Sequence, residues 1–114
     1  MEIISSKITG KELVSKITYF KTMLKAVVDV KKRVIAIESE LHSDLEAYLM
    51  ENGSKQENLW GINLYPLQDK NDFIEYTSLI NIRPHQDNPS MEIENPDIKK
   101  KVEEIVFELI NYDS

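Results

Sequence analysis

The most strand-like segment of the chain reads Leu59-Trp60-Gly61-Ile62-Asn63-Leu64-Tyr65-Pro66, and a second run follows it from Phe73 to Pro84. Both runs are rich in β-branched and aromatic residues, as strands are, and each ends on a proline. Each also carries an asparagine three residues before that proline, Asn63 and Asn81. Asparagine is disfavoured inside strands because its side chain competes for backbone hydrogen bonds. The matched pair therefore predicts a polar patch on a hydrophobic sheet.

Outward from these two strands, periodicity and capping residues predict the other elements. Further strands are expected at Met23–Val30 and Val34–Ile37, and helices at Gly10–Phe20, at Glu40–Asn52 and from Pro96 onward. The resulting order, αββαββα, predicts an α+β two-layer sandwich. We expect a four-stranded, mainly antiparallel sheet with the helices on one face, in a single domain spanning residues 1–114.

Composition excludes several classes of function. The chain has no cysteine, which excludes disulfides, thiolate metal sites and a cysteine nucleophile. It has no apolar run long enough to span a membrane and no signal-peptide pattern, which predicts a cytoplasmic protein. Its net charge of −6 disfavours nucleic-acid binding, and the basic turn Lys31-Lys32-Arg33 is the only local exception. We expect no cofactor.

Strand alternation places the polar residues of the two strands on one face. The expected set on the face away from the helices is Asn63, Tyr65, Glu75, Asn81 and Arg83. Amide, carboxylate and guanidinium groups together could form the floor of a site for a small polar ligand. Two other interpretations remain open: a solvated sheet face stabilised by cross-strand pairs, and a homodimer or protein-partner interface.

A second group of candidates lies where a strand meets a helix. His42 stands between acids in the segment Glu38–Asp44, where it could serve as a general base, as could Glu75. The same serines and acids are also typical of a helix N-terminus, and one histidine among them is weak evidence for a metal, so no metal site is predicted. His85 follows the fourth strand and is a further catalytic candidate, with Gln86 beside it as a ligand-binding candidate. The sequence leaves open whether His42 and His85 meet.

Two functions compete on these residues. The first is a non-catalytic module that binds a ligand or a protein partner through the polar sheet face. The second is a small enzyme with its site at the ends of the third and fourth strands, in which Glu75 or His42 is the base and Arg83 holds an anion.

Several motifs resemble a small family of uncharacterised prokaryotic proteins, a domain of unknown function. They are Glu40-Leu41-His42-Ser43-Asp44, Asn52-Gly53-Ser54-Lys55-Gln56, Leu59–Pro66, and Ser78–Pro84 followed by Gln86. The resemblance covers the chain from about Lys25 onward and implies an αβ fold, with no assigned activity. Members of that family often carry a glycine and arginines after the last motif. In this chain the segment Asp87–Glu92 contains neither residue type. If that loop binds an anion in other members, this chain lacks the groups that would bind it.

Overall fold

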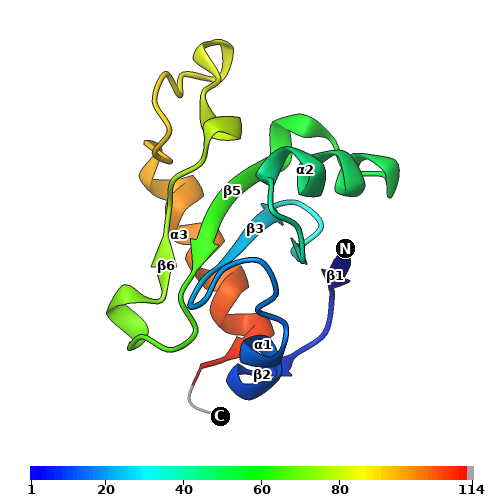
Figure 1. Cartoon of the computed structure of the whole chain (residues 1–114). Helices are drawn as coiled ribbons and strands as arrows, with labels where there is room; N and C mark the ends of the chain where they lie inside the picture. The colour runs from blue at the N-terminus through cyan, green and yellow to red at the C-terminus, as the bar shows by residue number, and fades with distance from the viewer. Residues whose placement is uncertain (113–114) are drawn as a thin grey trace.

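The structure is a computed structural model that describes residues 1–112, and within them five strands form the central sheet (Figure 1). All neighbouring strands in it run antiparallel. In spatial order the strands are β1 (Glu2–Ile4), β4 (Val34–Ile37), β3 (Leu24–Asp29), β5 (Leu59–Leu64) and β6 (Ile74–Glu75).

The pair β3–β5 forms the middle of the sheet and is its longest ladder. It runs without interruption from Leu24 opposite Leu64 to Asp29 opposite Leu59. Most positions of both strands are apolar, with Lys25, Asp29 and Asn63 as the polar exceptions, and β5 is buried along its whole length. Burial on both faces accounts for this composition, because a half-exposed strand would alternate between apolar and polar residues.

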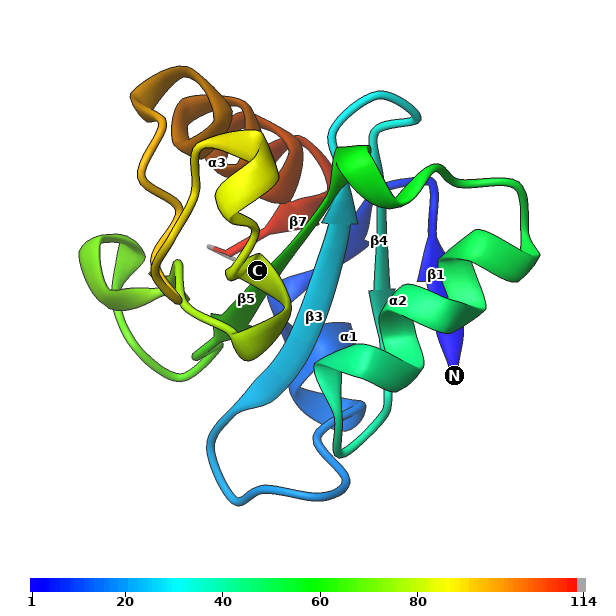
Figure 2. The ribbon, with the colours of Figure 1, turned by 90° about the horizontal axis from the view of Figure 1, so that it is seen from above.

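Helices cover both faces of the sheet (Figure 2). On one face, α1 (Gly10–Ser15) and α3 (Pro96–Leu109) pack on the main core, which includes Trp60 and Ile62 of β5. On the other face, α2 (His42–Glu51) contributes Leu45 and Leu49 to a smaller cluster. Alternation assigns the side chains of β5 correctly: Trp60, Ile62 and Leu64 belong to the main core, and Gly61 and Asn63 face the side of α2.

Three details of the predicted architecture are wrong. The sheet has five strands, because Glu2–Ile4 pairs with β4. The helices do not share one face, since α2 lies opposite α1 and α3. The run from Phe73 to Pro84 is not one strand: β6 ends at Glu75, and the short 3-10 helices η3 (Leu79–Asn81) and η4 (Pro84–Gln86) follow it. The α+β class and the mainly antiparallel sheet are confirmed.

The predicted capping residues agree with the structure, but the first helix is shorter than predicted, because α1 ends at Ser15 and not at Phe20. Thr9 and Glu12 form the capping box of α1, and Asn95 caps α3 ahead of Pro96. Gly53 follows α2 with a φ of +95°, the left-handed conformation that stops a helix. Two short strands, β2 (Ile8–Thr9) and β7 (Ile110–Asn111), form a separate parallel pair. No helix within residues 1–112 combines the length and the apolar character required to cross a bilayer.

Asn88 organises the irregular segment that follows β6. Its buried side chain donates to the carbonyl oxygens of Asn81 (2.7 Å), Ser90 (3.1 Å) and Glu92 (2.8 Å), and accepts from the amide of Glu94 (2.9 Å). A single side chain thereby replaces much of the backbone pairing that regular structure would provide. This segment forms one wall of the site described next.

Candidate functional site

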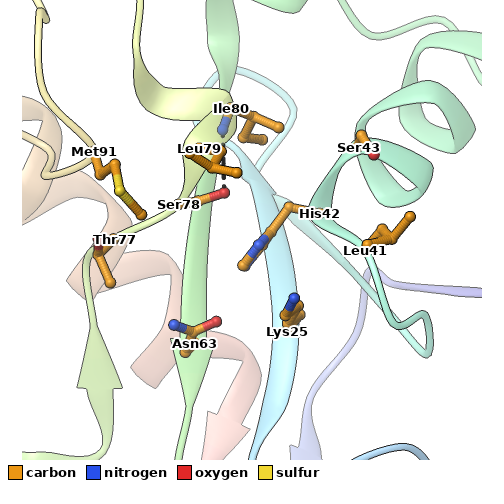
Figure 3. Close-up of a pocket in the computed structure, with 10 residues that line it drawn as sticks. All are labelled: Lys25, Leu41, His42, Ser43, Asn63, Thr77, Ser78, Leu79, Ile80 and Met91. Carbon is orange, nitrogen blue, oxygen red and sulfur yellow. Dashed lines mark hydrogen bonds between the residues drawn. The ribbon is translucent and has the colours of Figure 1, made fainter.

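A cavity of about 370 Å³ lies on the α2 face of the sheet (Figure 3). We call it the sheet-face cavity. Its floor comes from β3 and β5, one wall from the start of α2, and the opposite wall from the segment after β6. It is lined by Lys25, Leu41, His42, Ser43, Asn63, Thr77, Ser78, Leu79, Ile80 and Met91.

A row of polar residues crosses the sheet from strand to strand, of which Lys25 and Asn63 line the cavity and Glu75 does not. Lys25 of β3 is opposite Asn63 of β5, which is opposite Glu75 of β6. Asn63 donates a hydrogen bond from Nδ2 to Glu75 Oε1 at 2.7 Å, and the hydroxyl of Tyr65 donates to the same oxygen at 3.2 Å. Burial, with the negative charge of Glu75, raises the pKa of Tyr65 and keeps it a donor. The predicted polar face therefore exists for Asn63, Tyr65 and Glu75.

Asn63 has one unsatisfied atom. The residue is only 8% exposed, and its buried Oδ1 has no hydrogen-bond partner among the described residues. The amide cannot be turned over to remove this problem, because Glu75 must accept a hydrogen bond from Nδ2. Figure 3 shows Oδ1 on the side of Asn63 where Lys25 and His42 lie. Buried acceptors without partners are rare, so this oxygen marks a place where a donor is missing.

His42 projects from the first turn of α2 into the sheet-face cavity (Figure 3). Its Nε2 lies 2.7 Å from the carbonyl oxygen of Ile62, which can only accept, so Nε2 carries the proton. Burial lowers the pKa of His42 below its ordinary value, and the Lys25 ammonium lowers it further. The hydrogen bond to Ile62 and the nearby Asn63 side chain act in the opposite direction. In its neutral form, His42 keeps Nδ1 as an acceptor.

Lys25 was not predicted from the sequence, although it is the cationic residue of this cavity. Its side chain is half-buried, and Nζ lies 5.3 Å from the centre of the Phe20 ring. It makes no ion pair with any described residue. The available signal was cross-strand pairing: in an antiparallel β3–β5 ladder, Lys25 comes directly opposite Asn63.

Asn81 has a structural role that strand alternation could not predict. Its Oδ1 accepts from the amide of Gly61 at 2.8 Å, while Nδ2 donates to the carbonyl oxygens of Gly61 (2.9 Å) and Met91 (3.1 Å). The side chain is fully buried and does not line the sheet-face cavity. Asn81 therefore pairs with the backbone N–H and C=O groups of β5 at the part of its edge that β6 does not reach.

Arg83 is likewise held within the protein and lies outside the cavity lining. Its guanidinium donates to the carbonyl oxygens of Ile80 (2.9 Å) and Gln56 (2.9 Å) and to Glu46 Oε2 (3.1 Å). It also stacks on Trp60, 5.0 Å from the ring centre, and is 4% exposed. Burial lowers the pKa of Arg83, and Glu46 opposes that shift. The structure thus places Arg83 in a buried network joining α2 to β5.

His85 and Gln86 belong to η4 and do not line the sheet-face cavity. His85 is exposed and lies outside the cavity that His42 lines. Gln86 donates to the carbonyl oxygen of Glu57 at 3.1 Å. The structure therefore brings His42 together with Asn63, but not with His85, Asn81 or Arg83. Among residues 1–112, no group of three or more His, Cys, Asp or Glu side chains is placed to hold a metal.

The remaining lining residues are mainly apolar and were also not predicted. Leu41, Leu79 and Met91 are 51%, 71% and 42% exposed, although each is a large hydrophobic side chain. Figure 3 shows Leu79 and Met91 on one side of Asn63 and Lys25, and Leu41 on the other. Grouped exposure of this kind is more informative than scattered apolar residues, because it often accompanies a binding site.

Comparison with known proteins identifies the family without assigning an activity. Searches of the curated proteins and of the solved structures both returned no match. A family described as "Protein of unknown function (DUF5674)" matches residues 2–109, which is almost the whole chain. The predicted resemblance to an uncharacterised family is thereby confirmed, and the chain belongs to the DUF5674 family of proteins of unknown function.

Proposed function

We propose that this protein binds a small molecule with an anionic group in the sheet-face cavity. The observation that carries the proposal is Lys25, a half-buried cation in the cavity lining that has no ion-pair partner among the described residues. Partial burial without a partner costs free energy, which a bound anion would recover. The Phe20 ring that Lys25 contacts carries no charge, so the ammonium charge remains available to a bound anion.

The shape of the cavity and the surrounding groups support the same function. Its volume of about 370 Å³ falls within the range of small-molecule sites. Residues His42 and Ser43 begin α2, so the positive end of the helix dipole faces the cavity beside Lys25. Asn63 lies opposite Lys25 on the cavity floor and is held in place by its hydrogen bond to Glu75, so it offers a bound molecule a fixed polar contact. Ligand pockets usually have this composition, with a small number of polar groups placed among apolar walls.

A thermal-shift screen of small carboxylates, phosphates and sulfonates tests the proposal. The wild type is compared with Lys25→Met, which removes the charge and keeps the apolar stem, and with Lys100→Met as control. Lys100 is exposed on α3, away from the cavity. At least one anion should stabilise the wild type and the control but not Lys25→Met. If no anion does so, or if Lys25→Met responds equally, the proposal fails.

An enzyme that uses His42 as general base is a second candidate. Donation from Nε2 to Ile62 fixes the tautomer and leaves Nδ1 as the basic nitrogen, in a side chain that lines the cavity. His42→Gln distinguishes the two functions. A binding protein retains most of its affinity in this variant, whereas an enzyme converts its ligand in the wild type and loses turnover in the variant while still binding.

A further inference from the structure

We infer that the ligand of the sheet-face cavity is an apolar α-amino carboxylate with a free N–H, as in a free amino acid or at the C-terminus of a peptide. This inference rests on the proposed function and specifies its ligand. Three features of the cavity carry it: the single cation Lys25, the unsatisfied oxygen of Asn63, and the exposed apolar rim.

The charge of the cavity fits a singly charged anion. Among the described residues that line the cavity, Lys25 is the only lysine or arginine, and His42 is kept toward its neutral form by burial. A phosphate group, with its greater charge, is normally held by several cations or by arginine forks. A carboxylate needs one ammonium and a few N–H donors, which Lys25 and the first turn of α2 supply.

The unsatisfied oxygen of Asn63 requires a donor next to that carboxylate. Lys25 and Asn63 are cross-strand partners, so their Cβ atoms are expected to lie about 5 Å apart. A ligand that meets both must carry its N–H beside its anionic group, as an α-amino carboxylate does. Oδ1 is enclosed in the unliganded structure. Lys25 lies beside it and has no ion-pair partner within residues 1–112, so its flexible side chain can leave the Phe20 ring as it takes up the carboxylate (Figure 3).

The rim requires the ligand to be apolar as well. Leu79 and Met91 on one wall, and Leu41 on the other, are exposed above the polar floor. An aliphatic side chain placed between them would remove apolar surface from water on both partners, which favours binding. A small polar amino acid such as glycine would leave this surface exposed.

Titration of the 114-residue protein by two-dimensional ¹H–¹⁵N NMR tests the inference with N-acetyl-L-leucine as probe. The side-chain amide signals of Asn63 report on the site directly. N-acetyl-leucinamide lacks the charge, N-acetyl-N-methyl-leucine lacks the N–H, and N-acetylglycine lacks the apolar side chain. Each should bind about ten-fold more weakly than the parent acid, the expected loss for one such interaction.

Variants of the protein complete the test. Lys25→Met should weaken N-acetyl-leucine about ten-fold and Lys100→Met should not. Leu79→Ser should weaken N-acetyl-leucine but leave N-acetylglycine unchanged. Free leucine and the peptide Gly-Gly-Leu are then compared. Tighter binding of leucine indicates that the ligand is a free amino acid, and tighter binding of the peptide indicates a peptide C-terminus. Both results support the inference.

Two outcomes would overturn the inference, and they have different consequences. If N-acetyl-leucine does not bind, or its amide binds equally well, while another anion from the screen still depends on Lys25, the ligand class is wrong and the proposed function stands. If no anion binds in a manner that depends on Lys25, both fail.

Discussion

Asn81 pairs with Gly61 through its side chain as a neighbouring strand would pair through its backbone. The Gly61 amide donates to Asn81 Oδ1 at 2.8 Å, and Asn81 Nδ2 donates to the Gly61 carbonyl oxygen at 2.9 Å. Both atoms of one side-chain amide are used where β6 has already ended. The asparagine that looked like a ligand contact in the sequence therefore belongs to the hydrogen bonding of the sheet.

Asn81→Ala should destabilise the protein by about 3 kcal/mol, because a buried N–H and buried carbonyl oxygens each lose a partner. Urea denaturation followed by circular dichroism measures the change. Asn71→Ala is the control, since Asn71 is exposed in η2 (Lys70–Asp72), and it should cost less than about 0.5 kcal/mol. Equal stability of the two variants would contradict the structural role of Asn81.

Gly61→Ala should be destabilising for a steric reason, by about 1–3 kcal/mol. A Cβ atom at position 61 would lie 2.5 Å from Ser78 Cβ, which is too close for two non-bonded carbon atoms. Because the clash is with Cβ, Ser78→Ala cannot relieve it but Ser78→Gly can. In a double-mutant cycle, Gly61→Ala with Ser78→Gly should lose less stability than the sum of the two single variants. Additive losses would exclude the clash as the cause.

Arg83→Ala should lower the free energy of unfolding by about 3 kcal/mol, because it removes a buried guanidinium with its hydrogen bonds and leaves the partly buried Glu46 without its cation. The milder variant Glu46→Gln keeps a hydrogen-bond acceptor and should cost about 1 kcal/mol. Chemical denaturation of both variants checks this order. If Arg83→Ala kept full stability and lost only ligand binding, the guanidinium would be a binding group after all.

Stability should depend on pH through His42. Its pKa is lower in the folded protein than the ordinary 6.5, so the unfolded chain binds the proton more readily. The stabilising contribution is complete above about pH 6.5 and is lost as the pH falls from there through the folded-state pKa. His42→Gln, which retains a donor for Ile62, should remove this part of the pH dependence, whereas His85→Gln on the exposed η4 should not. A wild type that becomes more stable between pH 7 and pH 5 would reverse the sign and refute the prediction.

The sequence predicts the local features of this fold well and its long-range pairing less well. Alternation along Leu59–Tyr65 places Asn63 on the correct face, because strand geometry fixes that choice. The same rule fails for Asn81 and Arg83, since the chain leaves the sheet after Glu75 and alternation no longer applies. The strand at Glu2–Ile4 is only three residues long, and its partner β4 lies some thirty residues away in the sequence. No local pattern identifies such a pairing.

In the candidate site, too, some residues can be recognised from the local sequence and others only from the three-dimensional structure. His42, Asn63, Tyr65 and Glu75 are recognisable as polar residues beside an apolar strand. Lys25 is not, because its significance depends on being opposite Asn63 and on having no ion-pair partner among the described residues. Leu79 and Met91 are also not recognisable, because nothing local in the sequence distinguishes an apolar residue beside a cavity from any other. Their position at the cavity depends on the irregular segment that the Asn88 side chain holds together.

The scaffold around Asn88 has an evolutionary consequence. The wall that carries Leu79 and Met91 is held by side-chain hydrogen bonds from Asn81 and Asn88 to the backbone, not by the packing of the exposed residues themselves. Substitutions at positions 79 and 91 therefore change the cavity opening at little cost in stability. Relatives that keep the two asparagines are free to diversify this wall, much as a rigid framework permits variation in the loops it supports.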